Sequence, residues 1–277
     1  MTQYKKRSEL KNAAREKLSG KYGSAMLVSP LLQGCLAFVT VFPVIMILIM
    51  VYAVIVAMDL ANGMTETESL NAILPGFMVF YLGAYALCSF LTGILKVGIS
   101  YFYLNIACGK RHSVADIFYG FRWQFKKSLA LSVITQLPSF VLMIPYAIFT
   151  VLHEMNPQTH WLIATYVSYF VALIVTIPIQ LMLSQCFYLL LDFPNATVKE
   201  ILSLSIRVMK GQKARLFLLQ LSFIPMEFLC ICSLYVGYLW YIPYSGMTYT
   251  LFFLDIMQPA VQNTTKQPEI ENASELF

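Results

Sequence analysis

The sequence predicts an all-α membrane protein. We expect a polytopic helix bundle of about six transmembrane helices, with amphipathic helices at the cytoplasmic surface, an organisation compatible with three helical-hairpin repeats. The first observation is composition, because 58% of the 277 residues are hydrophobic and only 12% are charged, unlike a soluble domain. The second is the length of the uncharged runs at residues 22–58 and 161–191. Each holds a complete span, since about 20 apolar residues cross a bilayer.

Shorter apolar runs predict the remaining spans. Residues 69–95 and 128–152 supply one crossing each. The last run, 216–254, is long enough for two spans hinged near residues 235–237. A five-span alternative applies if part of this run lies at the membrane surface instead of crossing it.

The distribution of basic residues predicts the orientation. All 19 Lys and Arg residues fall in the two termini and in the loops 96–127 and 192–215, whereas the intervening loops contain none. By the positive-inside rule, the basic side faces the cytoplasm. The net charge of +5 is then explained by the topology, because a basic cytoplasmic side is attracted to the anionic lipids of the inner leaflet. Since this accounts for the charge, we expect no nucleic-acid partner. The candidate lipid-surface contacts are Lys110, Arg111, Lys126, Lys127, Lys210, Lys213 and Arg215.

Three amphipathic segments are expected at the membrane surface. Residues 1–21 are basic and place Leu10, Ala14 and Leu18 on one helical face. The segments after Ser113 and Thr197 each have an acidic residue three positions later, which is the capping-box spacing of a helix start. The motif Phe-Tyr-Leu precedes both segments, at residues 102–104 and 187–189, and indicates an internal repeat.

Small residues mark the second predicted span. Gly83, Ala86, Ser89 and Gly93 recur at spacings that place small side chains along a helix. Such residues usually allow two helices to approach closely in lipid. We therefore interpret them as packing positions rather than as a hinge that lines a pore.

Residues 192–225, 237–244 (GYLWYIPY) and 252–255 (FFLD) resemble an uncharacterised bacterial membrane-protein family, domain of unknown function 975. The similarity extends from Leu10 to about Asp255 and is strongest after Asp192. The resemblance implies a multi-span protein of the bacterial inner membrane. It implies no activity and no catalytic residues.

The residues that could perform chemistry do not form a recognisable site. The six cysteines lie in predicted spans or at the cytoplasmic boundary, where a disulfide framework is not expected. His153 and His160 share one loop but lack a zinc-binding spacing. There is no phosphate-binding glycine loop and no nucleophile motif, so we expect neither an enzyme nor a cofactor.

Glu227 is the exception, because it lies within the fifth predicted span. An ionisable group in a membrane is costly and suggests a functional site. Gln220 shares its helix face, and Gln136 and Gln180 add polar groups to the third and fourth spans. These side chains either hydrogen-bond neighbouring helices or line a polar cavity for a solute, ion or proton.

Two functional classes follow. In the first, the chain is a structural or accessory membrane protein whose basic cytoplasmic helices bind anionic lipid or a membrane-protein partner. In the alternative, it is a small-solute or ion transporter or channel that uses a cavity around Glu227. One integral membrane domain is predicted for residues 1–257. The polar segment 258–277 is predicted to be a disordered cytoplasmic tail.

Overall fold

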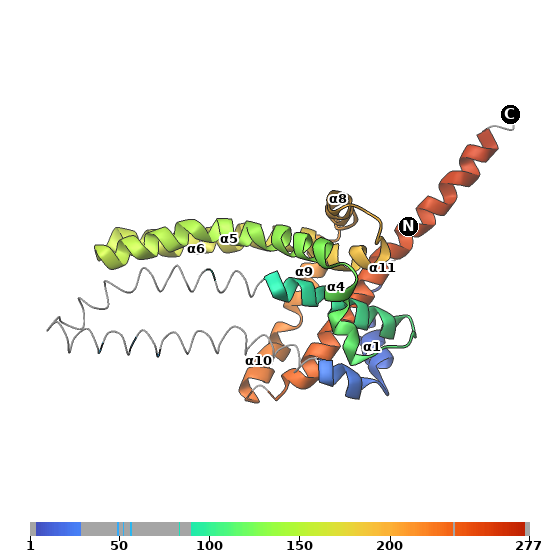
Figure 1. Ribbon diagram of the computed structural model, residues 1–277, viewed down its shortest axis with the longest axis horizontal. Coiled ribbons are helices and arrows are strands. Elements are labelled where there is room, and N and C mark those ends of the chain that lie inside the picture. Colours follow the sequence, from blue (N-terminus) through green and yellow to red (C-terminus); the bar gives the residue numbers. More distant parts are fainter. Residues whose placement is uncertain are drawn as a thin grey trace.

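The computed structural model describes residues 4–28, 90–234 and 236–274, together with the single positions 49, 52, 56 and 83. Within these ranges every regular element is helical and no strand is present, which confirms the all-α prediction. A long helical hairpin extends from a body formed by the other helices, and both chain ends lie on the side of that body away from the hairpin tip (Figure 1).

The hairpin consists of α5 (Phe125–Met155) and α6 (Thr159–Leu183), which lie side by side. They coincide with the third and fourth predicted spans. Large apolar side chains on both helices are exposed, including Ile144 at 53%, Phe170 at 60% and Ile174 at 69%. An apolar surface of this extent is rare on soluble proteins, and together with the length of the two helices it indicates a hairpin that faces lipid.

Four described segments are long and apolar enough to cross a membrane: Phe90–Ala107, Phe125–His153, Thr159–Asp192 and Lys213–Cys232. The protein is therefore a polytopic helical membrane protein. The predicted number of six spans is not confirmed. The first predicted span and most of the second lie outside the described residues, and α11 (Tyr238–Ser274), at the predicted sixth position, is not among the four segments.

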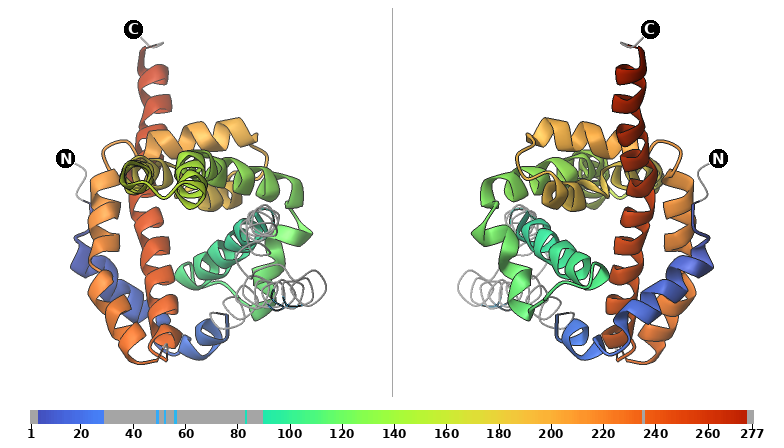
Figure 2. Two further views of the ribbon diagram at one scale, coloured as in Figure 1. Left: turned by 90° about the vertical axis from the view of Figure 1, so that its left-hand side faces the viewer. Right: turned by 90° about the vertical axis from the view of Figure 1, so that its right-hand side faces the viewer.

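The C-terminal helices run across the direction of the hairpin. In Figure 2, α5 and α6 are seen end-on, whereas α11 and the pair α9 (Lys213–Leu221) and α10 (Ile224–Cys232) run up the view. A break at Ser222–Phe223 separates α9 from α10. Pro225 explains the break, because proline lacks the backbone N–H that would continue the helical hydrogen bonds.

The main core forms where α1 (Arg7–Leu18) packs on α11. Leu10, Ala14 and Leu18 are at most 1% exposed, which confirms the predicted amphipathic helix and its apolar face. This face packs against protein, in a cluster that also contains Phe223 and Phe252. The apolar face of α1 is therefore covered by protein rather than by lipid.

Both predicted capping boxes are present. Ser113 opens a short 3-10 helix, η1 (Val114–Phe118), followed by α4 (Tyr119–Arg122). Thr197 opens α8 (Val198–Val208). The two Phe-Tyr-Leu motifs both lie in helices: residues 102–104 lie near the end of the helical segment Phe90–Ala107, and residues 187–189 lie in α7 (Cys186–Asp192). The copies diverge afterwards, since Pro138 leaves α5 continuous whereas Pro225 divides α9 from α10.

Glycines allow the segment Phe90–Ala107 to lie against two neighbours. A Cβ atom at Gly93 would lie 2.2 Å from Oγ of Ser132 in α5, and one at Gly98 would lie 1.8 Å from the carbonyl oxygen of Ile117 in η1. The packing role predicted for Gly93 is thus confirmed. Of the other residues in that pattern, Ala86 and Ser89 lie outside the described residues, and a Cβ at Gly83 would meet no described neighbour within 4 Å.

The C-terminal part of α11 overlaps the segment 258–277. The helix continues to Ser274 and projects beyond the body (Figure 1), where the sequence predicts a disordered tail. A polar helix that stands alone is marginal in water. Disorder of this tail in solution stays a prediction.

Candidate functional site

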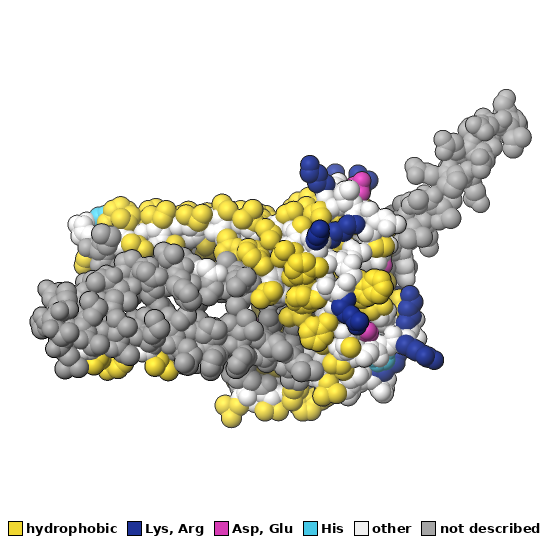
Figure 3. All heavy atoms as spheres, viewed as in Figure 1, with side chains coloured by type: hydrophobic (Ala, Val, Ile, Leu, Met, Phe, Trp, Pro, Cys, Tyr) yellow, Lys and Arg dark blue, Asp and Glu magenta, His cyan; other side chains and the backbone are white. Residues whose placement is uncertain are grey.

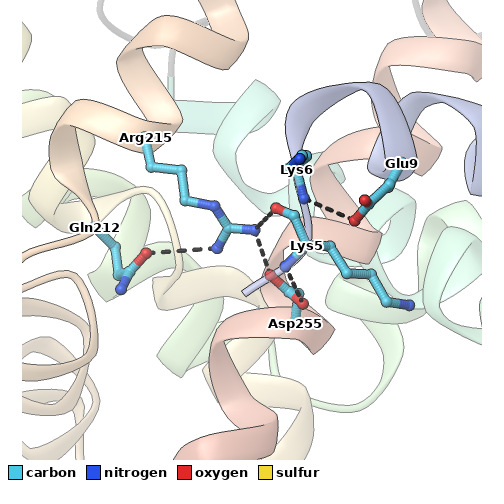
Figure 4. Close-up of polar contacts among 6 residues, drawn as sticks. All are labelled: Lys5, Lys6, Glu9, Gln212, Arg215 and Asp255. Atoms are coloured by element: carbon cyan, nitrogen blue, oxygen red, sulfur yellow. Dashed lines mark hydrogen bonds and ion pairs between the residues drawn. The ribbon is translucent and has the colours of Figure 1, made fainter. Parts of the chain in front are cut away.

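An ion pair joins three distant parts of the chain. Arg215, at the start of α9, pairs with the carboxylate of Asp255 in α11, and Figure 4 shows both side chains converging on Lys5. Nη2 of Arg215 donates to the carbonyl oxygen of Lys5 at 2.5 Å, and the amide of Lys5 donates to Oδ1 of Asp255 at 3.3 Å. Asp255 is only 5% exposed. The arrangement holds the N-terminus against α9 and α11.

One cation of α1, Lys11, binds the break between α9 and α10. Nζ of Lys11 donates to the carbonyl oxygen of Ser222 at 3.0 Å and lies 4.2 Å from the ring centre of Phe223. Burial lowers the pKa of Lys11 from its ordinary value, and Arg15 and Arg7 lower it further. The ammonium thus stabilises a carbonyl group at the break that Pro225 introduces.

The seven candidate lipid contacts do not have equal access to lipid. Lys110, Arg111, Lys126 and Lys210 are exposed. Lys127 is partly buried and donates from Nζ to the carbonyl oxygens of Pro194 and Ala196, so it fastens the start of α5 to the loop before α8. Lys213 is half-buried, and Arg215 is engaged with Asp255. We refer to the four exposed residues as the basic end.

The four candidate intramembrane polar residues separate into two places. On the hairpin, Nε2 of Gln180 donates to the carbonyl oxygen of Thr135 at 3.0 Å and to Oγ of Ser139 at 2.9 Å, joining α6 to α5. Gln136 is half-buried on α5. Glu227, on α10, accepts a hydrogen bond from the hydroxyl of Tyr241 in α11. Gln180 and Glu227 therefore connect helices, as the packing interpretation predicts.

Gln220 lines a cavity of about 260 Å³ between several segments. The walls come from the segment Phe90–Ala107, the break between α6 and α7, and the helices α7, α9 and α11. Lys96 and Gln185 also line this cavity. Neither was singled out in the sequence as a site residue, although Gln185 is a polar residue at the end of a long apolar run.

The described part of the chain holds no group of three His, Cys, Asp or Glu side chains that could bind a metal ion. Cys108, Cys186, Cys230 and Cys232 are free thiols. Cys35 and Cys88 lie outside the described residues.

The exposed apolar hairpin, the four membrane-length segments and the charged body define the class as a polytopic helical membrane protein. The chain belongs to the family described as "Protein of unknown function (DUF975)", which matches residues 1–260. The family is uncharacterised and carries no assigned activity. No curated protein and no solved structure matches the chain.

The hydrogen bond between Tyr241 and Glu227 gives a direct test of the packing interpretation. Replacing Glu227 with Gln keeps an acceptor for the Tyr241 hydroxyl, so the free energy of unfolding should change by less than about 0.5 kcal/mol. Glu227→Leu leaves the buried hydroxyl without its acceptor and should cost about 1–3 kcal/mol. Thermal unfolding of the purified protein in detergent compares the variants. Equal losses in Gln and Leu variants would show that the negative charge, not the hydrogen bond, is required.

Proposed function

We propose that this chain is a structural or accessory protein of the bacterial cell membrane that binds anionic lipid, or a membrane-protein partner rich in negative charge, through its basic end. The supporting observation is the separation of side chains along the molecule. In the face shown in Figure 3, Lys and Arg gather over the body and hydrophobic side chains cover the hairpin. Exposed cations next to an apolar span attract anionic lipids by about 1 kcal/mol for each residue near the surface.

The proposed orientation of the protein in the membrane follows from the same separation of basic and hydrophobic side chains. The basic end and both chain termini lie away from the turn at residues 156–158 that joins α5 to α6. By the positive-inside rule, the basic end and the termini face the cytoplasm, and this turn faces outward. A reporter that works only outside the cytoplasm should be active when it is fused at Asn156 and inactive when it is fused after Phe277. A reporter that works only in the cytoplasm should give the opposite result. The reverse pattern would overturn the proposed orientation.

Tryptophan quenching by brominated lipids tests the lipid contact. Trp123 is 75% exposed beside the basic end, whereas Trp161 lies near the hairpin tip. With Trp123 as the sole tryptophan, brominated phosphatidylglycerol should quench more strongly than brominated phosphatidylcholine at equal mole fraction. The difference should shrink at high salt, which screens exposed charges. It should also shrink when Lys110, Arg111, Lys126 and Lys210 are all replaced by Gln.

The variant with Trp161 as the sole tryptophan is the matched control, because the described residues around the hairpin tip include no Lys or Arg. It should show no preference between the two lipids. Equal quenching of Trp123 by both lipids would argue against the basic end as a lipid contact and in favour of a protein partner.

Transport through a polar cavity at Glu227 is the alternative function, and the geometry supports it less well. Gln136 and Gln180 lie on the hairpin helices, whereas Glu227 lies on α10. The Glu227 carboxylate accepts a hydrogen bond from the Tyr241 hydroxyl, which is a packing contact between helices. Transport by this residue would require Glu227→Gln to abolish a pH-dependent proton or solute flux in liposomes. We expect the same background leakage from the wild type and the variant.

A further inference from the structure

The cavity of about 260 Å³ lined by Gln220 lies where several segments of the chain meet. Lys96, Ser100 and Tyr103 come from the segment Phe90–Ala107, and Ser184 and Gln185 come from the break between α6 and α7. Helices α7, α9 and α11 complete the wall. The volume lies just below the usual range for small-molecule sites, about 300–1,000 Å³. It has room for a lipid head group but not for acyl chains.

Lys96 provides the charge of this cavity. Of the described residues in the wall, it is the only charged one. Its side chain is exposed, and no ion pair or hydrogen bond links it to another residue in the described ranges. An ammonium group in the wall of a largely apolar cavity between membrane helices favours an anion, and basic pockets of this kind accept the head groups of anionic lipids.

Gln185 provides an unmatched hydrogen-bond acceptor. The residue is 3% exposed, and its Nε2 atom donates to Oγ of Ser184 at 2.9 Å. Its Oε1 atom is buried and has no hydrogen-bond partner among the described residues. A buried acceptor without a partner costs free energy. A ligand with a hydroxyl donor that enters the cavity would remove this cost.

The apolar part of the wall favours an amphiphile over a free anion. Ile99, Phe187 and Leu216 line the cavity beside the polar groups. Helix α9, which carries Leu216 and Gln220 into the wall, also exposes Phe217, Leu218 and Leu221 on its surface. Acyl chains could therefore pack on α9 while the head group occupies the cavity.

We propose that this cavity binds an anionic phosphate head group that carries a hydroxyl donor, with the phosphate on Lys96 and the hydroxyl on Oε1 of Gln185. The chemistry is that of a glycerophosphate, supplied either by phosphatidylglycerol or by soluble glycerol 3-phosphate. This site goes beyond the proposed function, since Lys96 does not belong to the basic end. The lipid contact of the basic end can fail while the cavity still binds, and the reverse also holds.

Native mass spectrometry of the purified full chain in detergent, titrated with phosphatidylglycerol, tests the charge. Lys96→Gln should weaken binding on the order of tenfold or more, because it removes a charged hydrogen-bond donor. Lys96→Arg should retain most of the affinity. The matched control is Lys199→Gln on α8, a lysine that is also exposed but lies outside the cavity wall, and this variant should bind as the wild type does. Equal loss in the two Gln variants would overturn the site.

Phosphatidylmethanol tests the hydroxyl, because it has the same charge as phosphatidylglycerol but no hydroxyl donor. The wild type should prefer phosphatidylglycerol, and Gln185→Met, which has a similar shape and no amide, should abolish the preference without loss of folding. A preference that persists in this variant would contradict the role of Gln185. Competition by glycerol 3-phosphate would identify a soluble ligand, and its failure to compete would identify the lipid. No binding dependent on Lys96 from either source would overturn the proposal.

Discussion

Replacing Arg215 with Met should lower the free energy of unfolding by about 3 kcal/mol, the loss typical of removing one partner of a buried ion pair. The change leaves the Asp255 carboxylate, which is 5% exposed, without its guanidinium. It also removes the bond to the Lys5 carbonyl oxygen and the contact with the Phe252 ring, whose centre lies 5.1 Å from Cζ of Arg215. Thermal unfolding of the purified protein in detergent, followed by circular dichroism, measures the loss.

The double variant Arg215→Met with Asp255→Leu tests whether the loss of stability comes from the carboxylate that Arg215→Met leaves unpaired. If the cost arises from a stranded carboxylate, the double variant should be more stable than Arg215→Met alone, since no buried charge remains. Arg207→Met on the exposed face of α8 is the matched control and should change stability by less than about 0.5 kcal/mol. A loss for Arg215→Met no larger than that of the control would show that the pair contributes nothing.

Gly98→Ala should destabilise the protein by about 3 kcal/mol, at the upper end of the usual cost of inserting a methyl group into a packed interior. The new Cβ atom would lie 1.8 Å from the carbonyl oxygen of Ile117 and 2.8 Å from its Cα atom. These are backbone atoms, so no side-chain rotation can relieve the overlap. The segment Phe90–Ala107 would have to separate from η1, and Gly120 would lose its close approach to Ile94. Thermal unfolding in detergent reports the effect.

Gly23→Ala is the control for this substitution. Gly23 is also in a helical stretch, but a Cβ atom there would meet nothing within 4 Å. Alanine favours the helix over glycine by about 1 kcal/mol, so this variant should be unchanged or slightly more stable. If Gly98→Ala is as well tolerated as Gly23→Ala, the close contact between the two segments does not exist in the membrane.

Local features of the fold were predictable because their causes lie within a few residues. The capping box at Thr197 and the apolar face of α1 each depend on neighbours three or four positions away. The lengths of α5 and α6 follow from uncharged runs. The direction of α9 to α11 could not be predicted, because an apolar run has the same composition whether it crosses the membrane or lies across the other helices.

The candidate site residues also divide into features that the sequence predicts and features that depend on distant parts of the chain. Glu227 and Gln180 could be found as polar residues within apolar sequence, but not their partners Tyr241 and Thr135, which lie on other helices. Arg215 was predicted as a surface contact, because a single sequence does not show that a carboxylate 40 positions later returns to it. Gln185 was missed, since a polar residue near the end of a span is normally solvated at the interface.

The contact between the two ends of the chain has a consequence for biosynthesis. The hydrogen bond between the Lys5 amide and Asp255 joins residues that are 250 positions apart. At translation rates of about 5–20 residues per second, their synthesis is separated by on the order of 10–50 s. Throughout this time Leu10, Ala14 and Leu18 lack the helix that covers them. The first helix leaves the ribosome long before its partner, and we expect it to be held at the membrane surface, or by a chaperone, until α11 has been made.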